Sequence, residues 1–185
     1  MGISVSDYDD LLNSAIKAIS TRFDKETNST LARTTGFTDE FPTDQTEVPA
    51  SCFPIESVTK FELKSNETDG WSEQTGVKYL IRRACVISLV SPFSMLLAPG
   101  SPLLARVTYT GGYVLPGDTP AAGQTALPDD LEQAAIEQVA YWFRNREKTG
   151  LIRSWEHEGS YLVFLQSDLL LEVRAVLKKY ERFLL

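Results

Sequence analysis

The chain has 185 residues, 43% hydrophobic and 10% aromatic, which is enough for a packed core and excludes a fully disordered protein. Its formal net charge of -7 argues against a protein that grips nucleic acid, because such affinity comes mostly from lysine and arginine on phosphates. An acidic wall would still let a duplex slide past. We find neither a signal peptide nor the roughly 18 consecutive apolar residues that span a bilayer. The length predicts one domain, or one domain with an inserted or appended piece. The lack of a signal peptide indicates a protein made in a cytoplasm, with Cys52 and Cys85 expected to be free thiols.

The first predicted element is a helix over residues 6–23, which Ser6 can cap with Asp9 three residues on. Residues 24–49 are rich in Thr, Asp and Glu and predict a long irregular excursion, a kind of segment that often carries a partner contact. The helix has an apolar stripe that we expect to pack on the rest of the domain or, alternatively, on a partner: Tyr8, Leu11, Leu12, Ala15, Ile16, Ile19 and Phe23.

Period-two alternation begins after residue 50 and predicts an antiparallel β-unit over residues 50–113. It is clearest at 59–64, 77–82 and 103–109, and residues 86–90 form a further short apolar run. Together these stretches indicate three or four strands inserted between helices. Gly111 and Gly112 are expected to supply a positive backbone dihedral where the last strand ends. A loop over residues 114–127 follows.

The last third of the chain predicts two helices with a hairpin between them. A central helix over 128–149 starts with Pro128 as its first helical residue and stops at Gly150. Its wide apolar arc indicates a mostly buried helix, and a subunit interface on one side is the alternative for part of that arc. An extended hairpin over 151–166 and a C-terminal helix over 168–184 complete the chain. The predicted fold is α+β, a small helical bundle (N-terminal, central and C-terminal helices) with an inserted antiparallel β-unit.

No catalytic, metal or cofactor motif stands out. His157 is the only histidine, and it lies in the acidic run from Glu156 to Glu158, where an exposed turn is favoured over a metal ligand. Gly111-Gly112 matches no phosphate loop, and Asp129-Asp130 directly after a proline favours helix capping over acid–base chemistry. The two basic clusters, Arg82-Arg83 and residues 144–148, are interpreted as salt-bridge or subunit-contact residues. We therefore expect no enzymatic activity, no bound metal and no cofactor.

Short motifs in a consistent order resemble those of the head-tail connector family (adaptor, or head-completion proteins) of long-tailed double-stranded DNA phages. The family's pattern of "V-x-Y-x-x-G-Y" followed by "L-P-x-x-L-x-x-A" is similar to Val107–Tyr113 and Leu127–Ala135. The remaining motifs that carry the resemblance are Ser20–Phe23, Phe53–Val58, Asn145–Glu147 and Leu177–Arg182.

The resemblance implies a single connector domain over 1–185 and a homo-oligomeric ring, twelve-fold when assembled, in the virion neck. Such a ring lies under the portal protein, joins the DNA-filled head to the tail through a stopper or tail-completion protein, and lines the DNA exit channel without specific binding. Three alternatives remain open. The first is a related assembly protein, a stopper or tail terminator; the second is a DNA-packaging or regulatory DNA-binding protein; and the third is a small cytoplasmic enzyme. The residues expected at the interface with a neighbouring subunit or the portal are Arg144, Arg146, Tyr180, Arg182, Phe183, Leu184 and Leu185.

Overall fold

The computed structural model describes residues 8–91, 103–146, 154–155, 161–162 and 168–182. The chain divides into two compact units. The helical unit comprises Met1–Thr27 and Pro128–Tyr180, and the β unit comprises Asn28–Leu127 and Glu181–Leu185. The α+β fold with a β insertion is thus confirmed, and the insertion is larger than the predicted 50–113. No helix within the described ranges is long and apolar enough to cross a membrane.

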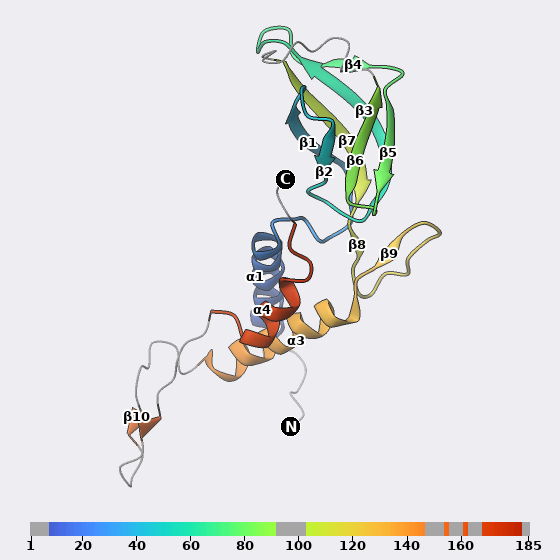
Figure 1. The fold of residues 1–185 in the computed structure, drawn as a ribbon. Helices are drawn as coiled ribbons and strands as arrows, with labels where there is room; N and C mark the ends of the chain where they lie inside the picture. The colour runs from blue at the N-terminus through green and yellow to red at the C-terminus, as the bar shows by residue number, and fades with distance from the viewer. Residues whose placement is uncertain (1–7, 92–102, 147–153, 156–160, 163–167, 183–185) are drawn as a thin grey trace. The chain divides into compact units, whose positions relative to one another are not determined.

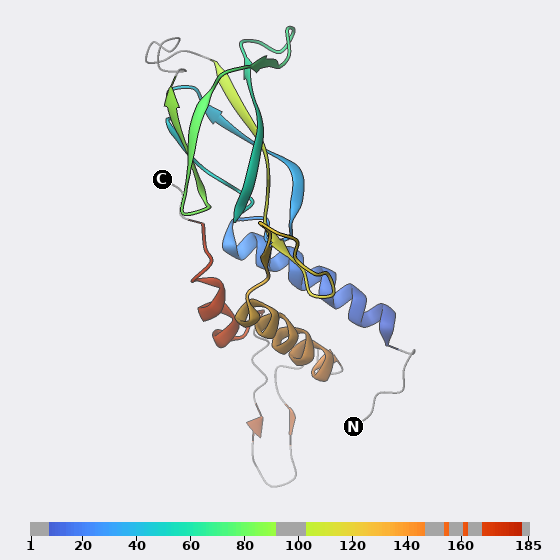
Figure 2. The ribbon, with the colours of Figure 1, turned by 90° about the vertical axis from the view of Figure 1, so that its right-hand side faces the viewer.

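The helical unit is built on three described helices (Figures 1 and 2): α1 (Asp9–Thr27), α3 (Asp129–Arg144) and α4 (Leu171–Leu177). Both α1 and α4 pack on α3. Its buried apolar side chains come from all three helices and the residue preceding α4: Ile19, Phe23, Leu131, Ala134, Leu169, Val173 and Leu177.

Helix α1 runs to Thr27, four residues past the predicted end at residue 23. Thr27 is buried, and its hydroxyl donates a hydrogen bond of 2.8 Å to the Phe23 carbonyl. The helix stops because Asn28 has a φ of 51°, the left-handed conformation that commonly ends helices. The predicted cap Ser6 lies outside the described residues.

Helix α3 begins one residue later than predicted, with Pro128 as the N-cap, and ends at Arg144 instead of 149. No side chain caps its start, so the capping expected of Asp129 and Asp130 is wrong. The helix is also not mostly buried: only Leu131, Ala134 and Gln138 are buried, because α1 and α4 cover a single side of it. The predicted stop at Gly150 lies outside the described residues.

The C-terminal helix is shorter than the predicted 168–184, because α4 spans only Leu171–Leu177. Its start is held by the buried Gln138 side chain of α3, whose amide oxygen accepts a hydrogen bond of 2.9 Å from the Leu170 N–H. Part of the predicted hairpin is confirmed: β10 (Ser154–Trp155) pairs antiparallel with β11 (Tyr161–Leu162). The expected turn near Glu158–Ser160 lies outside the described residues.

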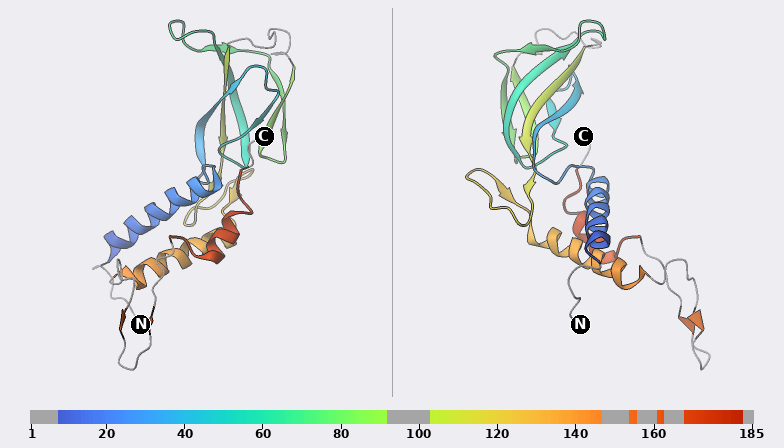
Figure 3. Two further views of the ribbon diagram at one scale, coloured as in Figure 1. Left: turned by 60° about the vertical axis from the view of Figure 1, so that its left-hand side comes forward. Right: turned by 180° about the vertical axis from the view of Figure 1, so that it is seen from behind.

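The β unit contains two larger sheets, as Figure 3 shows from two sides. The first has the order β1-β7-β3-β4, and the second has the order β2-β6-β5. Their strands are β1 (Thr34–Pro42), β2 (Glu47–Pro49), β3 (Ile55–Lys64), β4 (Ser72–Gln74), β5 (Lys78–Arg82), β6 (Val86–Ser91) and β7 (Leu104–Gly111). Both sheets contribute to one core of Phe41, Val48, Ala50, Cys52, Ile55, Phe61, Ile87, Ala105, Val107 and Tyr109.

The irregular excursion predicted over 24–49 is wrong, because β1 and β2 lie within it. Strand β1 pairs antiparallel with β7 from Phe37 to Pro42 without a break in register. Phe41 is buried, whereas Thr38 and Glu40 are exposed, so the strand does alternate. Its pattern is masked in the sequence by Asp39, a carboxylate that lies on the core side.

The two glycines that end β7 serve different purposes. Gly112 has a φ of 97°, as predicted, and a Cβ there would lie 2.6 Å from the Ala32 carbonyl oxygen. Gly111 does not have a positive φ, so that part of the prediction is wrong. It is instead required by a close approach, since a Cβ would lie 2.4 Å from the Cys52 carbonyl oxygen. The predicted loop 114–127 also contains part of a short parallel pair, β8 (Tyr113–Val114) with β9 (Thr125–Ala126).

Candidate interaction surfaces

Within the described residues, the side chains do not assemble a chemical centre. No group of three or more His, Cys, Asp or Glu residues lies close enough there to hold a metal ion. An open cleft of about 330 Å³ lies beside β3 and β4, but its lining from Val58 to Tyr79 carries no nucleophile paired with a base. His157 lies outside the described residues. The polar networks and exposed surfaces are therefore the features that bear on function.

Tyr109, in the motif that ends β7, is completely buried and holds three segments together. Its hydroxyl donates to Asp39 Oδ2 at 2.6 Å and accepts from the Cys52 N–H at 2.9 Å. Ser51 completes the carboxylate's shell, with its N–H at 2.8 Å from Oδ2 and its hydroxyl at 2.5 Å from Oδ1. Burial, and then the Asp39 carboxylate, raise the pKa of Tyr109 well above its ordinary value. The tyrosine is thus a neutral structural donor and not an acid–base group.

A second network lies on the side of the β1-β7-β3-β4 sheet opposite to the core. Glu62 is 6% exposed and accepts hydrogen bonds from Lys60 at 3.0 Å and from Arg106 at 2.7 Å and 2.9 Å. The Arg106 guanidinium lies over the Trp71 ring, 4.2 Å from its centroid. Burial raises the pKa of Glu62, but the bonds and charges of Lys60 and Arg106 outweigh burial, so this pKa lies below its ordinary value. The charges are satisfied internally, which makes the network a brace for the sheet.

The predicted interface residue Tyr180 follows α4 and binds to the start of α3 within the helical unit. Its hydroxyl donates to Asp130 Oδ1 at 2.6 Å, and the Lys179 ammonium lies 3.5 Å from the other oxygen. The Tyr180 hydrogen bond, with the positive charge of Lys179, holds the pKa of Asp130 below its ordinary value. Asp130 therefore links the start of α3 to the segment after α4.

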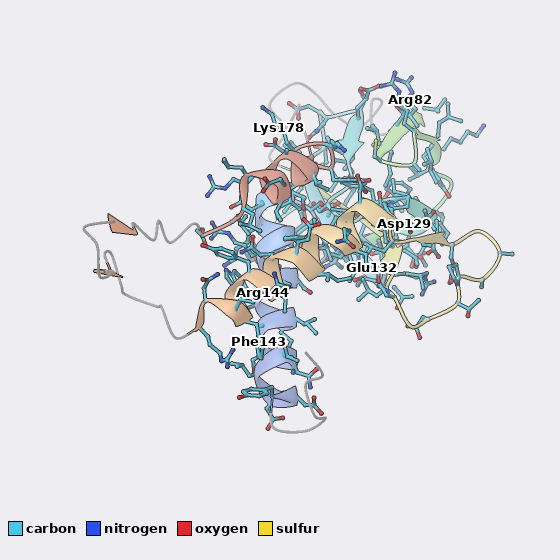
Figure 4. All side chains as sticks on the ribbon, turned by 90° about the horizontal axis from the view of Figure 1, so that it is seen from below. Arg82, Asp129, Glu132, Phe143, Arg144 and Lys178 are labelled. Atoms are coloured by element: carbon cyan, nitrogen blue, oxygen red, sulfur yellow. The ribbon has the colours of Figure 1, made fainter. Side chains whose placement is uncertain are left out.

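The three predicted arginines lie in different surroundings. Arg144 is exposed at the end of α3, next to Phe143, and Figure 4 shows both at the end opposite to Asp129. Arg146 donates to the Phe143 carbonyl at 2.8 Å, and its guanidinium lies 4.3 Å from that ring's centroid and 5.2 Å from that of Tyr8.

The third, Arg182, belongs to the β unit, where it donates to the Pro49 carbonyl at the end of β2 at 2.5 Å. The described members of the predicted set are thus divided between the two units, with Arg144, Arg146 and Tyr180 in the helical unit and Arg182 in the β unit. Phe183, Leu184 and Leu185 lie outside the described residues.

Exposed apolar side chains mark surfaces on both units. The stripe of α1 is buried only in its second half, at Ile19 and Phe23, so the expectation that it packs throughout is only partly met. The spacing of apolar residues in the sequence shows that a helix or strand has an apolar face, but it does not show whether another element covers that face. Among the described residues, the most exposed in the helical unit are Leu11 at 47%, Ile16 at 51%, Ile136 at 54% and Leu171 at 79%, and in the β unit Leu80 at 56%, Val90 at 59% and Leu115 at 46%.

Of the comparisons with known proteins, only the one with solved structures finds similar chains, and it concerns the fold. Neither a model of a known protein family nor a curated protein sequence matches the chain. Among solved structures, the chain is similar over its whole length to a chain in the neck of an empty gene transfer agent particle, computed with C6 symmetry, with a TM-score of 0.60, 16% identity and 85% of that chain covered.

Two further solved structures are similar in the same way. One is the virion of a native gene transfer agent particle, with a TM-score of 0.56, 16% identity, and 100% of this chain and 84% of that chain covered. The other is the neck of a native particle computed with C12 symmetry, with a TM-score of 0.56, 14% identity, and 96% and 85% covered. The chain thus has the fold of a protein chain found in the necks and virions of gene transfer agent particles.

Proposed function

We propose that this chain is a structural neck protein of a phage or phage-like particle. Its specific role is that of a head-tail connector (adaptor), a homo-oligomeric ring beneath the portal protein that joins the DNA-filled head to the tail. The single observation that carries this proposal is the likeness over 100% of the chain to a chain from the neck of a gene transfer agent particle.

Symmetry supports a ring of twelve subunits. The similar structures are described with both C6 and C12 symmetry, and a ring of twelve satisfies both, whereas a ring of six satisfies only the first. In a ring, a neighbouring subunit would cover the exposed apolar side chains of α1 and α3, since apolar patches on a protein surface commonly mark interfaces.

The charge of the chain fits a channel through which DNA passes. A formal net charge of -7 gives little attraction to phosphates and repels a duplex that approaches. DNA would therefore leave the head without being held by specific contacts, and the proposed role requires neither catalysis nor a cofactor.

The stopper or tail terminator is the second candidate, because the inserted segment Asn28–Leu127 makes up more than half of the chain and forms a β unit. Direct binding to the portal separates the two roles. An adaptor should bind purified DNA-filled heads that lack all other neck proteins, whereas a stopper should bind only after an adaptor has been added.

The experiment deletes the gene from a particle that encodes the chain and examines the products by electron microscopy. We expect filled heads and free tails that join when purified chain is added back, with twelve copies per portal by quantitative mass spectrometry. Complete, infectious or transducing particles assembled without the chain would refute a neck role. Six copies per portal, with binding only after another neck protein, would favour the stopper or terminator.

A further inference from the structure

The outer strands of the two sheets differ in how well they are protected against pairing with another chain. Edge strands are normally kept short or interrupted by proline, charges or bulges. Strand β4 has three polar residues, β2 has three residues and ends at Pro49, and β1 carries a break in register after Thr34 and ends at Pro42. Strand β5 has five residues, and the centre of it consists of Tyr79, Leu80 and Ile81.

This edge is open to solvent. Among the described strands β5 pairs only with β6, and all five of its residues are exposed. Leu80 is 56% exposed and Val90, on the adjacent strand, is 59% exposed. A row of free backbone groups flanked by large apolar side chains is the arrangement to which a further strand adds.

The same edge is positively charged within an acidic chain. No Asp or Glu lies between Glu73 and Asp118, whereas Lys78, Arg82 and Arg83 all fall on or directly after β5. Subtracting these three charges from the net charge of -7 leaves -10 for the rest of the chain. Arg82 pairs with Glu47 at 2.6 Å, and no ion pair within the described ranges involves Lys78 or Arg83.

These features favour an acidic protein strand as the occupant. Duplex DNA would be attracted by the charge, but it has neither a strand edge nor an apolar surface to cover Leu80. Two β5 edges placed against each other would bring the like charges of Lys78, Arg82 and Arg83 together, which opposes their association. The acidic surface elsewhere on a second copy of this chain has the complementary charge.

We infer that β5 adds a strand from a second copy of this chain, so that neighbouring subunits share a sheet through backbone hydrogen bonds. Such a contact joins two different surfaces, and contacts of this kind form rings when the rotation closes. Strands β5 and β1 lie on opposite sides of the β unit in Figures 1 and 3, so the unit has room for a different neighbour on each side. The inference rests on the proposed function, since it supplies the contact between subunits of the ring.

Site-directed photocrosslinking identifies the occupant. Leu80→Cys is made in a Cys85→Ser background, where the remaining Cys52 is 0% exposed, and is labelled with a benzophenone maleimide. Leu115→Cys in the same background is the matched control, because Leu115 is 46% exposed but lies outside β5. In assembled particles we expect the Leu80 probe, but not the Leu115 probe, to crosslink two copies of this chain.

A crosslink from residue 80 to another neck protein or to DNA, or no crosslink in particles that contain the chain, would overturn the inference while leaving the neck role intact. If the chain is absent from particles, the neck role fails, and the crosslinking is repeated on the concentrated purified chain. A dimer crosslinked through residue 80 but not through residue 115 would then support the inference, and the absence of such a dimer would overturn the inference. As a second measurement, Leu80→Lys should weaken ring formation on portals about tenfold or more, whereas Leu115→Lys should change it less than twofold. Equal effects of the two substitutions would also overturn it.

Discussion

Replacing Tyr109 by phenylalanine isolates the buried hydroxyl that ties β7 to β1 and to the segment around Cys52. The ring stays in place, including its contact with Phe37 at 5.7 Å between centroids, so the change removes one oxygen from a fully buried site. That oxygen donates to the Asp39 carboxylate at 2.6 Å and accepts from the Cys52 N–H at 2.9 Å.

The expected loss of stability follows from those two bonds. A hydrogen bond to a charged group contributes about 1.5–3 kcal/mol, and a buried donor left without an acceptor costs about 1–3 kcal/mol. The two contributions overlap in a single hydroxyl, and Asp39 keeps both of its bonds from Ser51. We therefore expect Tyr109→Phe to lower the free energy of unfolding by about 2–4 kcal/mol.

Urea denaturation followed by circular dichroism measures this change, with Tyr79→Phe as the control. Tyr79 is 36% exposed and its hydroxyl bonds to no described residue, so its removal should cost less than about 0.5 kcal/mol. Because burial and Asp39 raise the pKa of Tyr109 above 10.0, the stability of the wild-type protein should be full below that pH and fall as the pH rises beyond it. The reasoning is wrong if Tyr109→Phe costs no more than the control, or if it leaves the alkaline loss of stability unchanged.

Four other outcomes follow from the structure. Gly112→Ala should destabilise the protein by about 1–3 kcal/mol more than Gly117→Ala, because the two share a positive φ (97° and 102°) but only the first meets the backbone, so equal midpoints in urea would contradict the close approach. Since the pKa of Glu62 in the folded protein lies below 4.5, the stabilisation by its carboxylate is present at neutral pH and is lost as the pH falls through that folded pKa. Glu62→Gln should therefore reduce the loss of stability at acid pH, and an unchanged loss would count against the network. Trp142 is half-buried, so Trp142→Ala should cost about 1–3 kcal/mol by urea denaturation, less than a fully buried aromatic, and a loss above about 4 kcal/mol would show that this side of α3 is covered in the free protein. Sedimentation should find the free chain monomeric or weakly associated, with association easier at high salt because screening shortens the repulsion between acidic subunits to about 8 Å at physiological ionic strength; dissociation of a ring by salt would show that ion pairs dominate.

The sequence predicted those strands whose signal is local. Alternation identified β3, β5 and β7, and a short apolar run identified β6, because each of these signals lies within its own strand and needs no distant residue. Strand β1 was missed since Asp39, on its core side, is stabilised by Tyr109, 70 residues away. A partner at that separation leaves no trace in a local pattern.

The helices show the same limit. The apolar arc of α3 correctly predicted a helix, but it overestimated burial, because α1 and α4 cover only the side with Leu131, Ala134 and Gln138. The candidate interface was predicted from the C-terminal residues and the resemblance to connectors. Strand β5 was missed as a docking edge because exposure depends on the order of strands in the sheet, which alternation does not specify.

The inserted segment Asn28–Leu127 begins and ends beside the same strand, because β8 pairs with Ala32 near its start and with β9 (Thr125–Ala126) near its end. Ala32 forms a parallel bridge with Tyr113, which accepts a hydrogen bond from the Arg33 N–H at 2.9 Å and donates one to the Leu31 carbonyl at 2.8 Å. A segment whose two ends meet in this way can be cut out of a gene and replaced by a short linker, or transplanted into another helical scaffold, without stretching the chain on either side of it. Evolution can therefore exchange the β unit between proteins of this fold as a single segment, retaining the surfaces of one unit while altering those of the other.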